Sequence, residues 1–167
     1  MYYSISKFLE NWNRQVVITA EVLAAIPEHA VEKDGFSGLR KLDRLAYHIT
    51  QGMVQIGVNA GLFSGPELSQ DPLPERIADS LRLYFFHHHQ MARAVQNSWN
   101  DEMLTEEIEM YRQKFRRGDA LSLLERHEQH HRSQITMIMD LLDLRVPNLY
   151  LHVPVREKLI HRSSINS

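Results

Sequence analysis

The sequence contains no cysteine, which excludes disulfide bonds, thiolate metal ligands and a cysteine nucleophile. It also lacks any uninterrupted apolar stretch of the roughly 18 residues that a membrane-spanning helix requires. The first ten residues, MYYSISKFLE, include a Lys and a Glu and no apolar run, so we expect no signal peptide. These absences predict a cytoplasmic protein that neither crosses a membrane nor depends on oxidised thiols.

A strong charge of one sign is missing as well. The sequence contains 19 basic and 21 acidic side chains, which gives a net charge of −2. Such a balance gives no reason to expect nucleic acid or an anionic membrane as a partner. The 167 residues, of which 43% are hydrophobic and 24% charged, are enough for one globular domain with a full core.

The sequence is instead rich in histidine, with ten residues. Three of them, His127, His130 and His131, lie in the stretch 123–142, LLERHEQHHRSQITMIMDLL. At about 100° per residue, His131 falls in one apolar seam with the surrounding Leu and Ile side chains. His127 lies at the edge of this seam, one turn earlier, whereas His130 points away from it. Two imidazoles at positions i and i+4 on the core side suit two ligands of one metal ion.

The remaining apolar pattern also has a helical period. It predicts long helices over residues 4–26, 37–60, about 75–99 and 120–144, and a short amphipathic helix over 105–115. Residues 28–36 and 61–74 are expected to be loops, Gly118-Asp119 a break, and Asp119 the cap of the last helix. No stretch alternates convincingly as a strand. The sequence therefore predicts an all-α four-helix bundle as a single domain over 1–147, with a tail over 148–167.

A third imidazole comes from the second predicted helix, where His48 lies at the edge of the apolar seam. Gly52 is one turn further on and would leave space beside that ring. Together with His127 and His131, His48 could hold a metal ion through three nitrogens and leave a fourth position open, the pattern of a catalytic site. The alternative is that these histidines are polar residues satisfied by their neighbours. His131 speaks against it, because an imidazole within an apolar seam needs a partner.

Two further side chains are weaker candidates for catalysis. His88 is the one histidine of the run 87–89 that faces the seam of its helix, and it could be a fourth ligand, an acid or base, or a hydrogen-bonded core residue. The core role is the one we expect. Glu128 could orient a ligand histidine or move a proton. The alternative that we favour is a helix-surface ion pair with Arg132 at i+4.

These residues occur in motifs that resemble the DinB/YfiT-like family of metalloenzymes. The family pattern has a His, three residues, then His-Arg-Gly-Gln, and soon afterwards Val-Pro. Here LLERHEQHHRSQ (123–134) supplies His127 and His131-Arg132-Ser133-Gln134, followed by Val-Pro at 146–147. LAYHI (45–49) matches the context of the family's other ligand at His48, and AAIPEH (24–29) also fits. Ser133 replaces the usual Gly at a packing position.

The resemblance implies a bundle in the mirror variant of the up-and-down topology, often a homodimer. It implies a divalent metal ion, nickel or zinc, held by His48, His127 and His131. Family members with known activity include thiol-dependent S-transferases and a mycothiol-dependent isomerase, and many others are named only as hydrolases. A small-molecule substrate, with a low-molecular-weight thiol among the candidates, would be compatible with the lack of cysteine.

Three functions therefore stay open from the sequence. The chain could be a metal-dependent transferase or hydrolase that activates a thiol or a water. It could be a non-catalytic metal-binding or stress-related bundle, or a helical interaction domain without a metal. The open coordination position separates the first two, since a fourth protein ligand, His88 or a carboxylate, would close the site to substrate.

Overall fold

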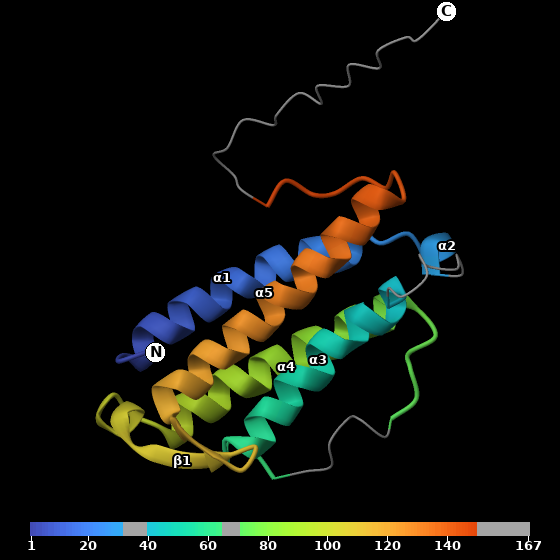
Figure 1. Cartoon of the computed structure of the whole chain (residues 1–167). Coiled ribbons are helices and arrows are strands. Elements are labelled where there is room, and N and C mark those ends of the chain that lie inside the picture. Colours follow the sequence, from blue (N-terminus) through green and yellow to red (C-terminus); the bar gives the residue numbers. More distant parts are fainter. Residues whose placement is uncertain (32–39, 65–70, 150–167) are drawn as a thin grey trace, which may run out of the picture.

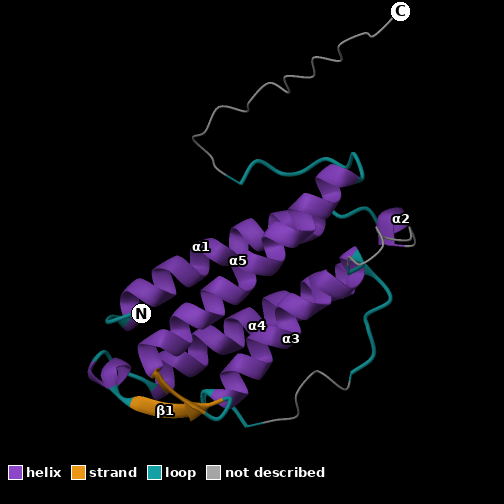
Figure 2. Cartoon of the chain, in the orientation of Figure 1, coloured by secondary structure: helices purple, strands orange, loops and turns teal. Residues whose placement is uncertain are grey.

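The computed structural model describes residues 1–31, 40–64 and 71–149. Four long helices run side by side, and a small hairpin lies near one end of them (Figure 1). In chain order the elements are α1 (Ile5–Ala24), α2 (Glu28–Val31), α3 (Leu42–Asn59), α4 (Ile77–Ser98), the 3-10 turn η2 (Glu102–Thr105), β1 (Glu107–Met110), β2 (Gln113–Arg116) and α5 (Arg117–Leu141). The predicted all-α helical bundle is confirmed, and Figure 2 shows how little of the chain is strand.

The packing places the histidine-bearing helices next to each other. α3 packs against both α5 and α4, and α1 covers α4 and α5 from the other side. The predicted seams are buried: Leu45 and Ile49 on α3 and Leu124 and Ile135 on α5 are each at most 2% exposed. The largest fully buried side chains are Trp12, Tyr84, Phe8, Leu23, Leu45, Ile49, Met91, Leu104, Met110, Leu121, Leu124 and Ile135. In the part of the chain that the structure describes, no helix combines the length and hydropathy needed to cross a membrane.

The prediction of a short helix over 105–115 is wrong. β1 and β2 form an antiparallel hairpin there, with Ile108 opposite Phe115. Its two-residue turn consists of Tyr111 and Arg112, both at positive φ (54° and 60°), the geometry that suits the twist of a hairpin. Such turns usually contain Asn or Gly, and neither occurs here. The turn therefore gives no sequence signal, although Ile108 and Met110 do alternate with glutamates.

The limits of α5 also differ from the prediction. The helix includes Gly118 and Asp119. A glycine is needed at 118 because the N-terminal residues pack against the helix here: a Cβ would lie 2.1 Å from the Tyr2 carbonyl oxygen. Asp119 lies in the first turn and does not cap the helix. At the other end, α5 stops at Leu141, three residues early. Asp143 adopts φ 56° and the Leu144 N–H donates to the Met139 carbonyl at 2.8 Å, which ends the helix in a Schellman-type turn.

The other limits shift modestly. α1 begins as predicted, with the Ser4 hydroxyl accepting from the Lys7 N–H. Residues 28–31, predicted as loop, form α2, and the rest of that loop to residue 36 lies outside the described residues. The second predicted helix begins later than expected, at Leu42, since residues 40–41 are not helical, and its predicted start at 37–39 lies outside the described residues. α4 starts at Ile77, whose N–H donates to the Glu28 carboxylate at 3.1 Å. Residues 65–70 of the next predicted loop and 150–167 of the tail are likewise outside the described ranges, and the domain boundary at 147 stays a prediction.

One core contact joins α1 to α4 through two aromatic rings. Trp12 stacks on His88 with centroids 4.5 Å apart and planes 4° from parallel. The His88 ring is 1% exposed, and its Nε2 lies 3.1 Å from the Trp12 carbonyl oxygen, while the Trp12 indole N–H donates to the His88 carbonyl at 3.3 Å. Burial lowers the pKa of His88 from 6.5 to about 4, against the hydrogen bond to Trp12, which raises it. His88 is thus the hydrogen-bonded core histidine that we expected.

We predict that His88 makes the protein lose stability in acid. Below pH 6.5 the unfolded chain takes up a proton at this position, whereas the folded chain does so only near pH 4. The free energy of unfolding should therefore fall as the pH is lowered through this window, by at most about 1.4 kcal/mol per pH unit for one such group. In His88→Gln, which keeps an N–H donor but does not titrate, urea titrations at pH 4 to 7 should give a shallower decline. A decline equal to that of the parent protein would contradict this, and His89→Gln, at an exposed position, is the control.

Candidate metal centre

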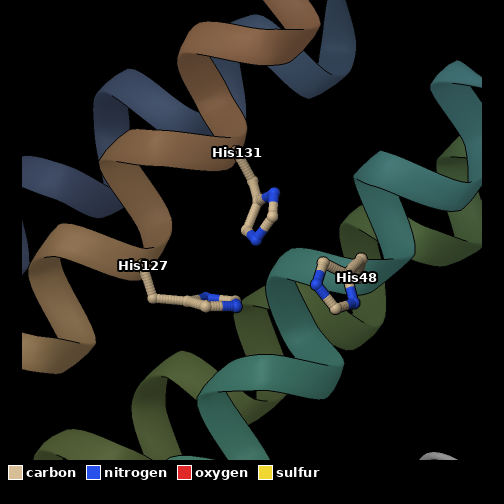
Figure 3. Close-up of side chains that lie close together, drawn as sticks. All are labelled: His48, His127 and His131. Carbon is tan, nitrogen blue, oxygen red and sulfur yellow. The ribbon is translucent and has the colours of Figure 1, made fainter. Parts of the chain in front are cut away.

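Three imidazoles meet between α3 and α5. His127 and His131 are one turn apart on α5, and His48 reaches toward them from α3 (Figure 3). One ring nitrogen from each residue can be chosen so that all three lie within 4.8 Å of one another. The ring centroids are 5.4 Å apart for His48–His127, 4.4 Å for His48–His131 and 4.5 Å for His127–His131. The structure thus brings together the three side chains that the sequence singled out, in a group of a size that could share one cation.

Gly52 provides the space for one of these rings. A Cβ on Gly52 would lie 1.9 Å from Cε1 and 2.2 Å from Nε2 of His127, closer than any side chain could tolerate. The sequence predicted that this glycine would make room beside His48, on its own helix. The space is instead filled across the helix interface, because α5 packs closely on α3 and directs His127 at this backbone. Gly52 is therefore part of the centre even though it offers no ligand atom.

The orientation of His131 is fixed by Gln134, one turn further along α5. His131 Nδ1 lies 2.7 Å from the Gln134 side-chain oxygen. Since an amide oxygen only accepts, Nδ1 carries the proton and the lone pair of Nε2 is left free. Metal-binding histidines are commonly held in this way by a hydrogen bond to the other ring nitrogen. Gln134 occurs in the family motif, but sequence reasoning assigned it no role.

The electrostatic environment keeps all three imidazoles neutral near pH 7. Burial, followed by the neighbouring imidazoles His131, His48 and His130, lowers the pKa of His127 to about 4. Burial is also the largest cause that lowers the pKa of His48 and of His131, and the positive charge of Arg40 lowers both further. Neutral imidazoles present lone pairs to a cation and compete little with protons.

Glu128 does not form the surface ion pair with Arg132 that we favoured from the sequence. Its side chain is 2% exposed, and its Oε1 accepts hydrogen bonds from the Thr19 hydroxyl at 2.6 Å and the Tyr84 hydroxyl at 2.7 Å. Arg132 donates instead to the Gln15 side-chain oxygen and to Thr19 Oγ1. Burial raises the pKa of Glu128, while the Thr19 and Tyr84 hydrogen bonds act in the opposite direction. Thr19 and Tyr84 had no distinguishing signal in the sequence, since each is one more residue in a helical seam.

The other histidines that the structure describes lie outside the group. His88 makes its ring contacts with Trp12, Tyr84 and His89 in the α1–α4 interface. His130 is exposed, as predicted, and so are His29 and His89, whereas His87 is half-buried. His152 and His161 are outside the described residues. Within the described residues, the group that could hold an ion contains no carboxylate and no fourth imidazole.

The family pattern seen in the motifs extends to nearly the whole chain, since the DinB family model matches residues 1–158. The chain belongs to the DinB family. It is 28% identical over 153 residues to an uncharacterized protein, YrdA, of Bacillus subtilis (strain 168), and the match covers 90% of both chains. It also resembles the crystal structure of a DinB-like protein from Bacillus cereus ATCC 10987, with a TM-score of 0.81, 27% identity, and coverage of 90% of this chain and 100% of the other.

Two hollows open beside the three imidazoles of this DinB-family protein. One, of about 280 Å³, is lined by His48 together with Arg40, Arg44 and Gln51. The other, of about 290 Å³, is lined by His131, Gln134 and apolar side chains of α3 and α5. The centre is therefore reached from outside the bundle, and a small molecule has room on either side of it.

We predict that adding a methyl group at Gly52 disrupts the centre by displacing His127. In an ordinary helix interior, Gly→Ala stabilises by about 1 kcal/mol, whereas in Gly52→Ala the Cβ would overlap the His127 ring. Gly52→Ala should therefore bind metal more weakly and unfold at lower denaturant than the parent protein. In a His127→Ala background the same change should be neutral or stabilising. Equal effects in the two backgrounds, measured by urea unfolding, would show that the ring does not occupy this space.

Proposed function

We propose that His48, His127 and His131 bind one divalent metal ion and that the protein is an enzyme using it to activate a thiol or a water. The observation that carries the proposal is the convergence of three neutral imidazoles in a group that includes no other protein ligand among the described residues. Three nitrogen donors with a fourth position left open are the pattern of catalytic zinc sites, in contrast to closed structural sites. The reaction we expect is thiol-dependent S-transfer or hydrolysis.

The residues around the imidazoles fit a metal ion. Gln134 leaves Nε2 of His131 free to act as a ligand, and Gly52 gives His127 a space that any other residue would fill. Burial discourages protonation of all three rings. Imidazole donors without thiolates suit borderline ions such as nickel or zinc, which are the two that we propose.

Bound there, a divalent ion would supply a Lewis acid that lowers the pKa of a thiol or water. The protein itself supplies the rest. His48, His127 and His131 fix the position of the ion, and Gln134 prevents the His131 ring from turning. Since the chain has no cysteine, a thiol nucleophile would have to be part of a small-molecule substrate, which the two hollows have room to admit.

A second candidate function is metal binding without catalysis, as in a stress-related binding protein. The position of Glu128 favours this non-catalytic function, because its carboxyl group is hydrogen-bonded to Thr19 and Tyr84 and is not a member of the three-histidine group. A centre with no carboxyl group of its own to move a proton would have to rely on substrate or solvent for that task. We keep a role in catalysis for Glu128 and His88 only as weaker hypotheses.

The first test compares two adjacent histidines. His131→Ala removes a proposed ligand from a position only 9% exposed, and the cavity alone should cost about 1–3 kcal/mol of stability. His130→Ala changes an exposed position and should do almost nothing. Elemental analysis of tag-free protein should give close to one metal per chain for the parent and for His130→Ala, and almost none for His131→Ala. If both variants keep their metal, His131 is not a ligand.

The same preparations also distinguish the two functions. Cobalt(II) replacing the native ion should develop a near-ultraviolet sulfur-to-metal absorption band on addition of 2-mercaptoethanol if the open position accepts a thiol. A cobalt protein whose spectrum does not respond to thiols would favour the non-catalytic function.

We further propose that two copies associate through the outer face of α1. Val17 is 57% exposed on this face, and an apolar hollow of about 530 Å³ runs beside it. Arg14 lies three residues before Val17, and Glu21 lies three residues after Ile18. An antiparallel pairing of two α1 helices about a two-fold axis between Val17 and Ile18 would therefore set each Arg14 against the partner's Glu21. We expect this homodimer in the cytoplasm, with no nucleic acid or membrane partner.

Light scattering tests the dimer. The parent protein should have about twice the 19.6 kDa mass of one chain, and Val17→Glu should approach a single chain, because the change places two like charges at the axis. Arg14→Glu should weaken the dimer, and adding Glu21→Arg in the same chain should restore it by exchanging the two charges. Leu141→Glu, at a position 52% exposed at the end of α5, is the control. A parent protein of single-chain mass over a wide concentration range would rule the dimer out.

A further inference from the structure

Two arginines lie beside the three imidazoles and have no part in holding them. Arg44 lies on the first turn of α3, one turn before His48, and Arg40 comes two residues before the helix begins. Both are exposed, and both line the same hollow as His48. Because residues four apart share a helix face, the Arg44 side chain and the His48 imidazole project to the same side of α3.

Arg40 also lines the second hollow, together with His131. Among the described residues, it is the one that the two hollows share, so its side chain borders both the hollow beside His48 and the hollow beside His131. The electrostatics agree with this position, since the charge of Arg40 lowers the pKa of both His48 and His131. A cationic group thus lies beside the centre, next to both hollows that open onto it.

In the part of the chain that the structure describes, these two arginines are not paired with carboxylates: no ion pair joins the guanidinium of Arg40 or Arg44 to one. Among the described residues that line the first hollow, Asp71 is the one acidic side chain, against two guanidinium groups, and Gln51 adds a neutral side chain. A divalent ion on the imidazoles would make the region still more positive. An anionic group entering here would meet donors that are not already used by carboxylates in the described part of the chain.

The second hollow has a different character. Beside Arg40, His131 and Gln134 it is lined by Leu45, Met137 and Ile138, and Met137 is 47% exposed. Apolar side chains next to a charged group are what a small molecule with an acidic end and a hydrocarbon part would contact.

We propose that the substrate of this centre carries a carboxylate or phosphate group, which Arg40 and Arg44 bind while the reacting group lies at the three histidines. The proposal rests on the function proposed above. Guanidinium groups suit this task, because their planar array of donors pairs with two oxygens of a carboxylate or phosphate. The apolar wall of Leu45, Met137 and Ile138 would cover the substrate's carbon skeleton. Arg40 and Arg44 are positioning residues in this scheme, and the chemistry stays at the imidazoles.

Three small thiols test this on the cobalt-substituted protein. 3-Mercaptopropionate, 2-mercaptoethanol and cysteamine present the same reacting group with an anionic, a neutral and a cationic end. The sulfur-to-cobalt absorption gives a dissociation constant for each. We expect the anionic thiol to bind at least about tenfold more tightly than the neutral one, the effect of one charge-assisted hydrogen-bonded pair, and the cationic thiol to bind most weakly.

The arginine variants show whether these residues cause the preference. Arg40→Gln and Arg44→Gln should reduce the ratio of the two dissociation constants toward one, with little change for 2-mercaptoethanol. Arg93→Gln, the same change at an exposed position of α4 that lines neither hollow, should leave the ratio as it is in the parent. Equal binding of the anionic and neutral thiols by the parent would overturn the proposal, as would a preference that survives in both Arg40→Gln and Arg44→Gln.

A second measurement separates this proposal from the activation of thiols. If no thiol changes the cobalt spectrum, the thiol function fails, and the arginines are then tested with succinate, which has no thiol. In NMR spectra of the zinc-treated protein with ¹⁵N-labelled arginine, succinate should shift the side-chain signals of Arg40 and Arg44 and leave that of Arg93 unchanged. Absence of any shift at Arg40 and Arg44 would overturn the proposal independently of the thiol result.

Discussion

The close approach of α3 and α5 at Gly52 is the contact on which the centre depends. The His127 ring fills the space of the missing side chain, so its position is set by the backbone of the opposite helix and not by rotamer preference alone. If the two helices moved apart, the three rings would no longer lie within reach of one ion. The bundle thus exchanges a well-packed apolar contact at this point for a polar centre, which fits a functional more than a stabilising role.

Polar side chains of α5 that are hydrogen-bonded to α1 and α4 fix the rotation of this helix about its own axis. Glu128 follows His127 directly in the sequence and accepts hydrogen bonds from Thr19 of α1 and Tyr84 of α4. Arg132 follows His131 directly and donates a hydrogen bond to Thr19 of α1. Rotating α5 enough to turn the imidazoles away from α3 would break these bonds and leave a buried carboxyl group without partners. The side of α5 that faces α1 and α4 therefore determines where the side that faces α3 can point.

Periodicity was sufficient for the bundle and for the phase of His131, since both follow from apolar residues repeating every three to four positions. It failed where the deciding contact is distant in sequence. The hairpin at 107–116 has a turn without Asn or Gly, so its turn residues do not predict it. Gly118 was predicted to break the helix, but it lies within α5 and allows the close contact with Tyr2. Glu128 and Arg132 have ideal i, i+4 spacing for an ion pair, yet each is hydrogen-bonded to residues of other helices. The family motif contained Gln134, but only the structure shows that its side-chain oxygen accepts a hydrogen bond from His131 Nδ1.

The face of α3 that carries His48 shows how one helix can combine several roles. Arg44, His48 and Gly52 follow each other at intervals of four residues, so they occupy successive turns on one side of the helix. Gly52 admits the ring of a neighbouring ligand, His48 supplies a ligand itself, and Arg44 lies at the hollow that leads to them. Because a helix is rigid over two turns, the backbone positions of Arg44 and His48 are fixed relative to each other, and an anion held at Arg44 would lie within the reach of that side chain from the imidazoles. The spacing along α3 would then select substrates by the distance between their acidic and reacting groups.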